Sequence, residues 1–213
     1  MNFDPAVNRW KENFSSESTF EYDVRIGEEE IINLRKLHVH DSLTVDEKFV
    51  EFVLERGEPG KTTLLVKNTT LYPFVYKIKT TKPSMYSVKP NQACINPGED
   101  RQIEITLIQK EVTRMLDEGP DNMDLSNHVF LVESKAITLN IARKLTILSS
   151  SDNHSKSKAN ELAERSRMYQ IIWGKSGSDS DSESDKGTDG GGGGEKDENL
   201  KTSQIGVKYS ILN

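Results

Sequence analysis

Short runs of alternating apolar and polar residues, separated by turn sequences, restrict the fold of this 213-residue chain more than any other feature. Apolar side chains recur at every second position, and so on one face, in residues 74–79, 101–107, 128–134 and 205–211. This pattern is typical of half-buried β-strands. Turns rich in Gly, Pro and Asn lie between the runs. Short strands spaced in this way predict an all-β fold, an antiparallel sandwich of two sheets. The side chains expected to face the core are Phe74, Tyr76, Ile78, Ile103, Ile105, Leu107, Phe130, Val132, Ile205, Val207, Tyr209 and Ile211.

The net charge of the chain belongs to one low-complexity segment, residues 176–199. Eight acidic residues there stand against Lys186 and Lys196, a net charge of -6, which is also the formal net charge of the whole chain. Subtracting them from 34 acidic and 28 basic residues leaves 26 of each. Because the segment has no apolar side chain and contains five consecutive glycines, we expect it to be disordered.

Two further segments depart from the strand pattern. Residues 157–173 have helical periodicity, with Leu162, Arg165, Tyr169 and Ile172 on one face. Residues 1–33 are expected to form an N-terminal extension whose order the sequence does not decide. No run approaches the roughly 18 consecutive apolar residues of a membrane-spanning helix.

Patterns that resemble chemical sites are weak in this chain. In "GEPGKTT", residues 57–63, the first glycine of a phosphate-binding loop would fall at Glu55, and a strand continues where a helix should begin; we interpret it as a hairpin turn. His38 and His40 are expected on one strand face, but they have no third ligand nearby and are interpreted as surface residues. The single Cys94 favours a reduced intracellular setting and is interpreted as a buried, inert thiol. We therefore expect no enzyme activity, no cofactor and no metal.

Residues 75–90 contain four lysines and no acidic residue, which is unexpected in an acidic chain. If alternate residues of this strand face the core, Lys77 and Lys79 project from the opposite face, and the following turn adds Lys82 and Lys89. Such a patch attracts acidic ligands. Lysines that solvate a sheet face or protect an edge strand are an equally common explanation.

Residues 76–100, "YKIKTTKPSMYSVKPNQACINPGED", resemble the signature of the major sperm protein (MSP) domain, in particular its VAMP-associated protein branch. That signature is an F-K-V-K-T-T strand followed by a proline, Y-x-V-R-P-N and a P-G turn. "TTLLVKNTT" (62–70) is similar to the family's L-x-L-x-N-x-T strand and turn, and "HVFLVES" (128–134) to its K-F-M-V-Q-S strand. "QIGVKYSI" (204–211) is similar to its closing strand, K-L-R-C-V-F.

The resemblance implies an immunoglobulin-like sandwich over residues 34–213, with a helical and disordered insertion before the last strand. The acidic segment 176–199 then lies inside the domain, and a long insertion costs little because closure entropy grows slowly with loop length. The family's usual continuation, a coiled coil and a membrane anchor, is not found after the closing strand, so we expect a cytoplasmic protein that reaches the endoplasmic reticulum only through partners.

The resemblance also implies a non-catalytic adaptor that binds acidic, aromatic-containing (FFAT-like) peptides, as proteins of the VAMP-associated branch do in endoplasmic reticulum tethering at membrane contact sites. Carried over position by position, the peptide site comprises Lys77, Lys79, Thr80, Thr81, Lys89, Val129 and Leu131. Lys89 replaces an arginine and loses its bidentate geometry, and Leu131 replaces a methionine. Val129 and Gln204 each replace a lysine, so two expected positive contacts are missing.

Two other functions remain open at this stage. A cytoskeletal, self-assembling role is implied by the nematode sperm branch of the same fold, which forms filaments, and it would make the protein a homo-oligomer. An immunoglobulin-like structural domain of the kind found in ciliary and centrosomal proteins shares the sandwich but not the K-T-T signature.

The acidic segment carries candidate phosphorylation sites. Ser178, Ser180 and Ser182 each have an acidic residue three positions later, the pattern that acidophilic kinases favour. Phosphates would add negative charge, so the segment could compete with acidic peptides for the lysine face. A purely solubilising loop is the plainer interpretation.

Overall fold

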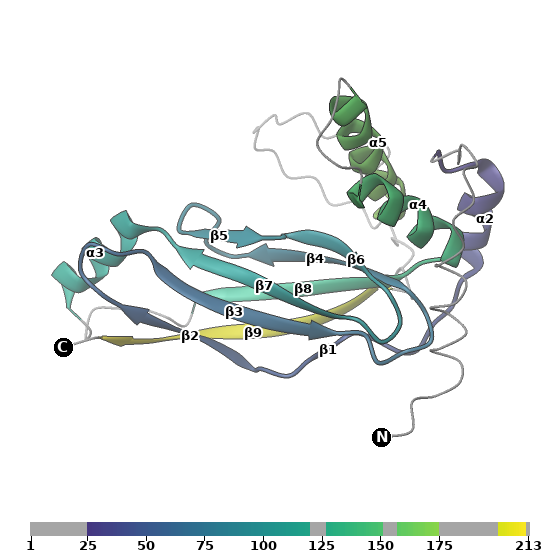
Figure 1. The fold of residues 1–213 in the computed structure, drawn as a ribbon. Coiled ribbons are helices and arrows are strands. Elements are labelled where there is room, and N and C mark those ends of the chain that lie inside the picture. Colours follow the sequence, from purple (N-terminus) through teal and green to yellow (C-terminus); the bar gives the residue numbers. More distant parts are fainter. Residues whose placement is uncertain (1–24, 120–126, 151–156, 175–199, 212–213) are drawn as a thin grey trace, which may run out of the picture.

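A computed structural model describes residues 25–119, 127–150, 157–174 and 200–211 of the chain, and these form two facing β-sheets with helices at both ends (Figure 1). One sheet has four strands in the order β1-β3-β7-β5, all antiparallel. Its strands are β1 (Thr44–Val45), β3 (Gly60–Lys67), β5 (Tyr86–Lys89) and β7 (Asp100–Leu107). The strand β7 was predicted over residues 101–107, and the predicted fold class of two sheets is confirmed.

The other sheet has five strands in the order β2-β9-β8-β4-β6. They are β2 (Phe49–Leu54), β4 (Phe74–Thr80), β6 (Gln92–Ile95), β8 (Val129–Ala136) and β9 (Leu200–Ile211). The expected closing strand is therefore an internal strand, between β8 and β2. Every pairing is antiparallel except that of β2 with β9, which is parallel, so the prediction of a wholly antiparallel sandwich is wrong for this pair.

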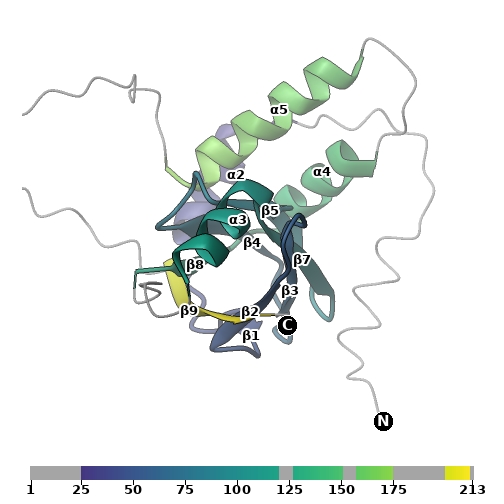
Figure 2. The same ribbon diagram turned by 90° about the vertical axis from the view of Figure 1, so that its left-hand side faces the viewer.

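The main core lies between the two sheets, and Figure 2 shows how the sheets face each other in a view turned by 90°. Ten of the twelve predicted inward residues are buried, and those of β7 have no exposed surface. Tyr209 and Ile211 differ: the first is half-buried and the second is 37% exposed. The reason is that the pairing of β8 with β9 stops at Val129 and Gly206, so the last residues of β9 have a neighbour on one side only.

A second, smaller core lies outside the sandwich and corrects the expected alternation of β4. Val75, expected on the outer face of that strand, has no exposed surface because helices cover it. It belongs to one cluster of buried residues with Leu34 of α2 (Glu28–Lys36), Ile141 of α4 (Leu139–Ser150) and Ile172 of α5 (Ser157–Ile172). The first half of β4 is therefore buried on both faces.

The helices gather at the two ends of the sandwich (Figure 1). The predicted helix over 157–173 is confirmed by α5, although Leu162 is 58% exposed. Helices α2 and α4 pack with α5 on the second core, whereas α3 (Gln109–Glu118) lies at the opposite end and places Val112 and Met115 in the main core. These three helices were not predicted. The helix α2 spans residue 33, where the expected domain boundary lies.

Two local predictions about turns and strands are wrong. Residues 55–59 connect β2 of one sheet to β3 of the other, so "GEPGKTT" crosses between sheets rather than closing a hairpin; Gly57 there has φ of 90°, which favours glycine. His38 and His40 are exposed, as surface residues should be, but they lie in an irregular segment between α2 and β1 and not on a strand.

Candidate functional site

The outer face of the five-stranded sheet, on the side away from the main core, brings together residues from three strands. Lys79 of β4 pairs with Leu131 of β8, and Leu131 pairs with Gln204 of β9. Directly paired residues point to the same face of a sheet, so these side chains form one row. Lys79 and Leu131 were predicted for the peptide site, and Gln204 was predicted to replace a lysine of the family. The sheet therefore brings these three residues together.

A glutamate that was not predicted for the site lies next to this row. Glu133 pairs directly with Lys77, and its Oε1 accepts a hydrogen bond of 2.6 Å from Nζ of Lys79. The Lys79 side chain is 48% exposed and that of Glu133 is 15% exposed. The positive charge of Lys79 is therefore partly offset from within the protein. The alternation of "HVFLVES" was the available signal, since it places Glu133 on the same face as Val129 and Leu131.

The two threonines of the predicted site hold the end of β4 in place. The hydroxyl of Thr81 accepts a hydrogen bond from N of Val129 at 3.1 Å and donates one to O of Asn127 at 2.5 Å. Its own backbone N donates to O of Val129 at 3.1 Å. The hydroxyl of Thr80 accepts from N of Lys82 at 3.2 Å, which closes the next turn. These bonds fix the position at which Val129 enters the sheet.

The structure places Lys89 apart from the row. It is the exposed last residue of β5, in the four-stranded sheet, where it pairs with Glu104. The chain then turns into β6, and O of Asn91 accepts a hydrogen bond of 2.8 Å from N of Ile78. Lys89 is thus near a turn that borders β4, but it does not join Lys79 and Leu131 on their strands.

An exposed aromatic side chain borders the row at its other end. Phe49 of β2 pairs with Gly206, which pairs with Val129, so the three residues form a second row. Phe49 is 50% exposed, and Nζ of Lys208 lies 4.2 Å from the centre of its ring, a cation–π contact. A groove of about 480 Å³ opens here, which we call the Phe49 groove; it is lined by Lys48, Phe49, His128, Val129, Gln204, Gly206 and Val207. No sequence signal identified Phe49, because its pairing joins strands far apart in the chain.

Other sequence predictions have structural outcomes of their own. Cys94 is half-buried and free, and burial, followed by the nearby Glu99, raises the pKa of its thiol to about 12. The thiol is therefore protonated and unreactive at neutral pH. Within the described ranges, no group of three or more His, Cys, Asp or Glu side chains could hold a metal ion. Ser178, Ser180, Ser182 and the rest of 176–199 lie outside the described residues.

The comparisons with known proteins define the class of this chain. The family model of the MSP (Major sperm protein) domain matches residues 42–156, which is more than half of the 213 residues. The chain therefore belongs to the MSP domain family, whose general role is binding or structural. No curated protein matches the chain in sequence.

Several solved structures are similar to part of this chain. WR4, an MSP family member of C. elegans, is 13% identical, with a TM-score of 0.35 over 57% of this chain and 88% of WR4. SSP-19, an MSP-domain-like protein of Caenorhabditis elegans, is 11% identical, with a TM-score of 0.32 over 78% of this chain and 98% of SSP-19. The PapD-like domain 7 of human CEP192 is 9% identical, with a TM-score of 0.32 over 58% of this chain and 84% of that domain. The family assignment rests on the match over residues 42–156.

Proposed function

We propose that this MSP domain is a non-catalytic adaptor that binds acidic peptides carrying aromatic residues on the outer face of its five-stranded sheet. The observation that carries the proposal is the row of Lys79, Leu131 and Gln204 beside the Phe49 groove. A half-buried apolar side chain between cationic residues and a groove offers the two contacts that such a peptide requires.

The charge of the outer face supports an acidic ligand. Four lysines on it (Lys77, Lys79, Lys135 and Lys208) stand against Glu51 and Glu133, so the formal charge of the face is +2, in a chain of net charge -6. Charges farther away than the Debye length of about 8 Å at physiological salt are largely screened. The face is therefore proposed to attract acidic peptides through its local positive charge, although the chain as a whole is acidic.

Aromatic residues of the peptide are proposed to supply most of the affinity. Leu131 is half-buried on the outer face, and Phe49 and Val129 line the adjoining groove. Buried aromatic anchors dominate the binding energy of most interfaces, whereas exposed charges mainly set the rate and orientation of association.

Three features make the proposed site weaker than one with more free lysines. Val129 and Gln204 carry no charge, and Lys79 shares its charge with Glu133. An exposed ion pair contributes about 0.2–1 kcal/mol, so the combined effect is a reduced affinity and a shallow salt dependence.

The resemblance to the VAMP-associated branch favours partners with FFAT-like peptides at the endoplasmic reticulum and a cytoplasmic location. No helix in the described part of the chain is long and apolar enough to cross a membrane. Membrane association is proposed to occur through partners.

The test is calorimetric titration with a synthetic peptide that has two aromatic residues in an acidic tract. We expect binding by the parent chain and none by the Lys79→Glu/Leu131→Asp variant, which stays folded because both side chains point away from the main core. The matched control is Lys61→Glu/Thr63→Asp, which makes the same charge changes at exposed positions of β3 in the other sheet. A folded Lys79→Glu/Leu131→Asp variant that binds like the parent would refute the site.

A second candidate, self-assembly into a cytoskeletal structure, is favoured by one observation. In the described part of the five-stranded sheet β2 is an edge strand, and two of its outer residues, Phe49 and Val53, are each 50% exposed. Edge strands with exposed apolar side chains can pair with another chain. Light scattering over a range of protein concentrations separates the two functions, because an adaptor stays at one molecular mass and a self-assembling protein does not.

A further inference from the structure

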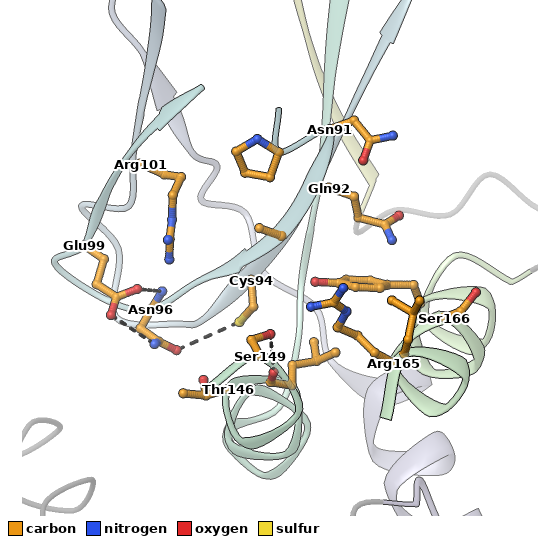
Figure 3. A pocket seen from close by; sticks show the side chains of 15 residues that line it. Asn91, Gln92, Cys94, Asn96, Glu99, Arg101, Thr146, Ser149, Arg165 and Ser166 are labelled. Carbon is orange, nitrogen blue, oxygen red and sulfur yellow. Dashed lines mark hydrogen bonds between the residues drawn. The ribbon is translucent and has the colours of Figure 1, made fainter. Parts of the chain in front are cut away.

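A second cavity, of about 520 Å³, lies between the β6 edge of the sandwich and helices α4 and α5 (Figure 3). Residues 90–101 form one wall and the two helices form the other. It shares no lining residue with the Phe49 groove. The cavity is therefore distinct from the proposed peptide site. A volume of this size is typical of small-molecule sites.

Two arginines from different elements line the cavity. Arg101 belongs to β7 and Arg165 to α5, and Figure 3 shows them on opposite sides of Cys94. Burial raises the pKa of Tyr169, and Arg165 and Arg101 each oppose that rise, so both guanidinium groups are within electrostatic reach of one phenol. Neither arginine makes an ion pair with any residue in the described ranges.

The one carboxylate of the cavity wall is already bound. Glu99 accepts hydrogen bonds from N of Asn96 at 2.9 Å and from Nδ2 of Asn96 at 3.1 Å, one on each carboxylate oxygen. With two arginines and one glutamate among its lining residues, the wall has a formal charge of +1. One net positive charge of the wall is therefore available to a ligand.

The uncharged polar groups add hydrogen-bond donors. Nε1 of Trp173 donates to Oε1 of Gln92 at 3.1 Å, so the amide of Gln92 keeps both of its N–H donors. The hydroxyl of Tyr169, protonated at neutral pH, makes no hydrogen bond with a described residue and is a further donor. Ser149 and Thr146 donate instead to carbonyl groups of their own helix. The Gln92 amide and the Tyr169 hydroxyl are therefore available as donors in addition to the two guanidinium groups, and donors of this kind are what an anion requires.

We propose that this cavity binds a small organic phosphate, a phosphate monoester on an apolar or aromatic body. Guanidinium groups match the geometry of phosphate oxygens, and a phosphate monoester carries about -1.5 to -2 charges at neutral pH, enough to occupy both arginines. The cavity also has apolar wall for the body of the ligand, provided by Pro90, Ala93, Leu145 and Leu162.

The test uses the full chain with Trp10→Phe, which leaves Trp173 as the only tryptophan. Phenyl phosphate is titrated in while Trp173 fluorescence and the heat of binding are measured. We expect saturation in both signals, weaker binding of inorganic phosphate, and no binding of phenol. Arg101→Gln and Arg165→Gln are each expected to weaken binding about ten-fold, the loss typical of one charge-assisted hydrogen bond.

The matched control is Arg167→Gln, on the same helix but not in the cavity wall. It is expected to bind like the parent, and circular dichroism verifies that each variant is folded. The proposal is overturned if neither phosphate produces heat or a fluorescence change at millimolar concentration, if benzoate or phenol binds as tightly as phenyl phosphate, or if Arg165→Gln has no effect. A phosphoserine peptide of residues 176–184 that binds more tightly than phenyl phosphate overturns the assignment to a small molecule.

Discussion

The ring of Phe49 lies against the backbone of Gly206, so closely that a Cβ on residue 206 would come within 2.7 Å of Cδ1. Glycine is otherwise unfavourable within a strand, by roughly 0.5–1 kcal/mol relative to alanine. Gly206 therefore gives space to an exposed aromatic side chain at the edge of the proposed peptide site.

This contact predicts a non-additive pair of substitutions. In the parent, Gly206→Ala displaces the Phe49 ring and disturbs its contact with Lys208, which offsets the gain from alanine. In a Phe49→Ala background the gain remains. We expect Gly206→Ala to be more favourable there by about 0.5–1 kcal/mol, measured by urea denaturation of all four proteins. Additive effects would show that the ring adjusts freely.

The hydroxyl of Tyr76 predicts a stabilising substitution. The side chain has no exposed surface, and its hydroxyl makes no hydrogen bond with a described residue. An unsatisfied buried hydroxyl costs about 1–3 kcal/mol, so Tyr76→Phe should raise the free energy of unfolding by about 1 kcal/mol. Tyr86→Phe is the control and should lower it, since the Tyr86 hydroxyl is 2.7 Å from Nδ1 of His128. Destabilisation by Tyr76→Phe would contradict this account of the core.

The same burial predicts a loss of stability at alkaline pH. Burial raises the pKa of Tyr76 from 10.0 to about 12, so the folded state keeps a proton that the unfolded chain releases. The stabilisation is complete below pH 10 and is lost as the pH rises from 10 to 12. Urea midpoints between pH 8 and 12 should fall, and less steeply in Tyr76→Phe than in the parent. An identical slope in the two proteins would exclude Tyr76 as a source.

The ion pair on the outer face predicts two substitutions that strengthen peptide binding. Glu133→Gln releases Lys79, and Val129→Lys adds a positive charge at the position where the family has lysine. Each should increase the affinity for the acidic peptide by about 0.2–1 kcal/mol, with a steeper salt dependence. Titrations at two salt concentrations measure both effects. Glu58→Gln, an exposed change in the turn between the sheets, should leave affinity unchanged, and equal gains from all three variants would implicate net charge alone.

The position of β9 predicts that residues 205–213 are needed for the stability of the domain and that residues 176–199 are not. Removal of residues 205–213 takes Ile205 and Val207 from the main core, leaves β2 without a neighbour in its sheet and shortens the partner of β8 to residues 200–204, so we expect no cooperative thermal transition. Replacement of 176–199 by a Gly-Ser segment of equal length should leave the melting temperature almost unchanged. Equal losses in the two proteins would contradict the view that 176–199 is an insertion.

The sequence predicted those parts of the fold whose signal is local. The inward residues of β7 and β8 follow from strict alternation, and α5 from its helical spacing. The burial of Val75 did not follow, because it depends on helices from distant parts of the chain. For the same reason the site was only partly predictable: the lysines lie in one strand, but Glu133 reaches Lys79 from the next strand.

The parallel pairing of β2 with β9 also determines when the five-stranded sheet can be completed during synthesis. The strand β2 ends at Leu54, and its neighbour in the sheet begins only at Leu200. At a translation rate of about 5–20 residues per second, β2 leaves the ribosome on the order of ten seconds before β9 exists. Over that interval the apolar side of β2, with Phe52 and Leu54, has no partner strand beside it. The nascent chain therefore presents an unfinished sheet edge to chaperones and to neighbouring chains until almost all of the domain has been made.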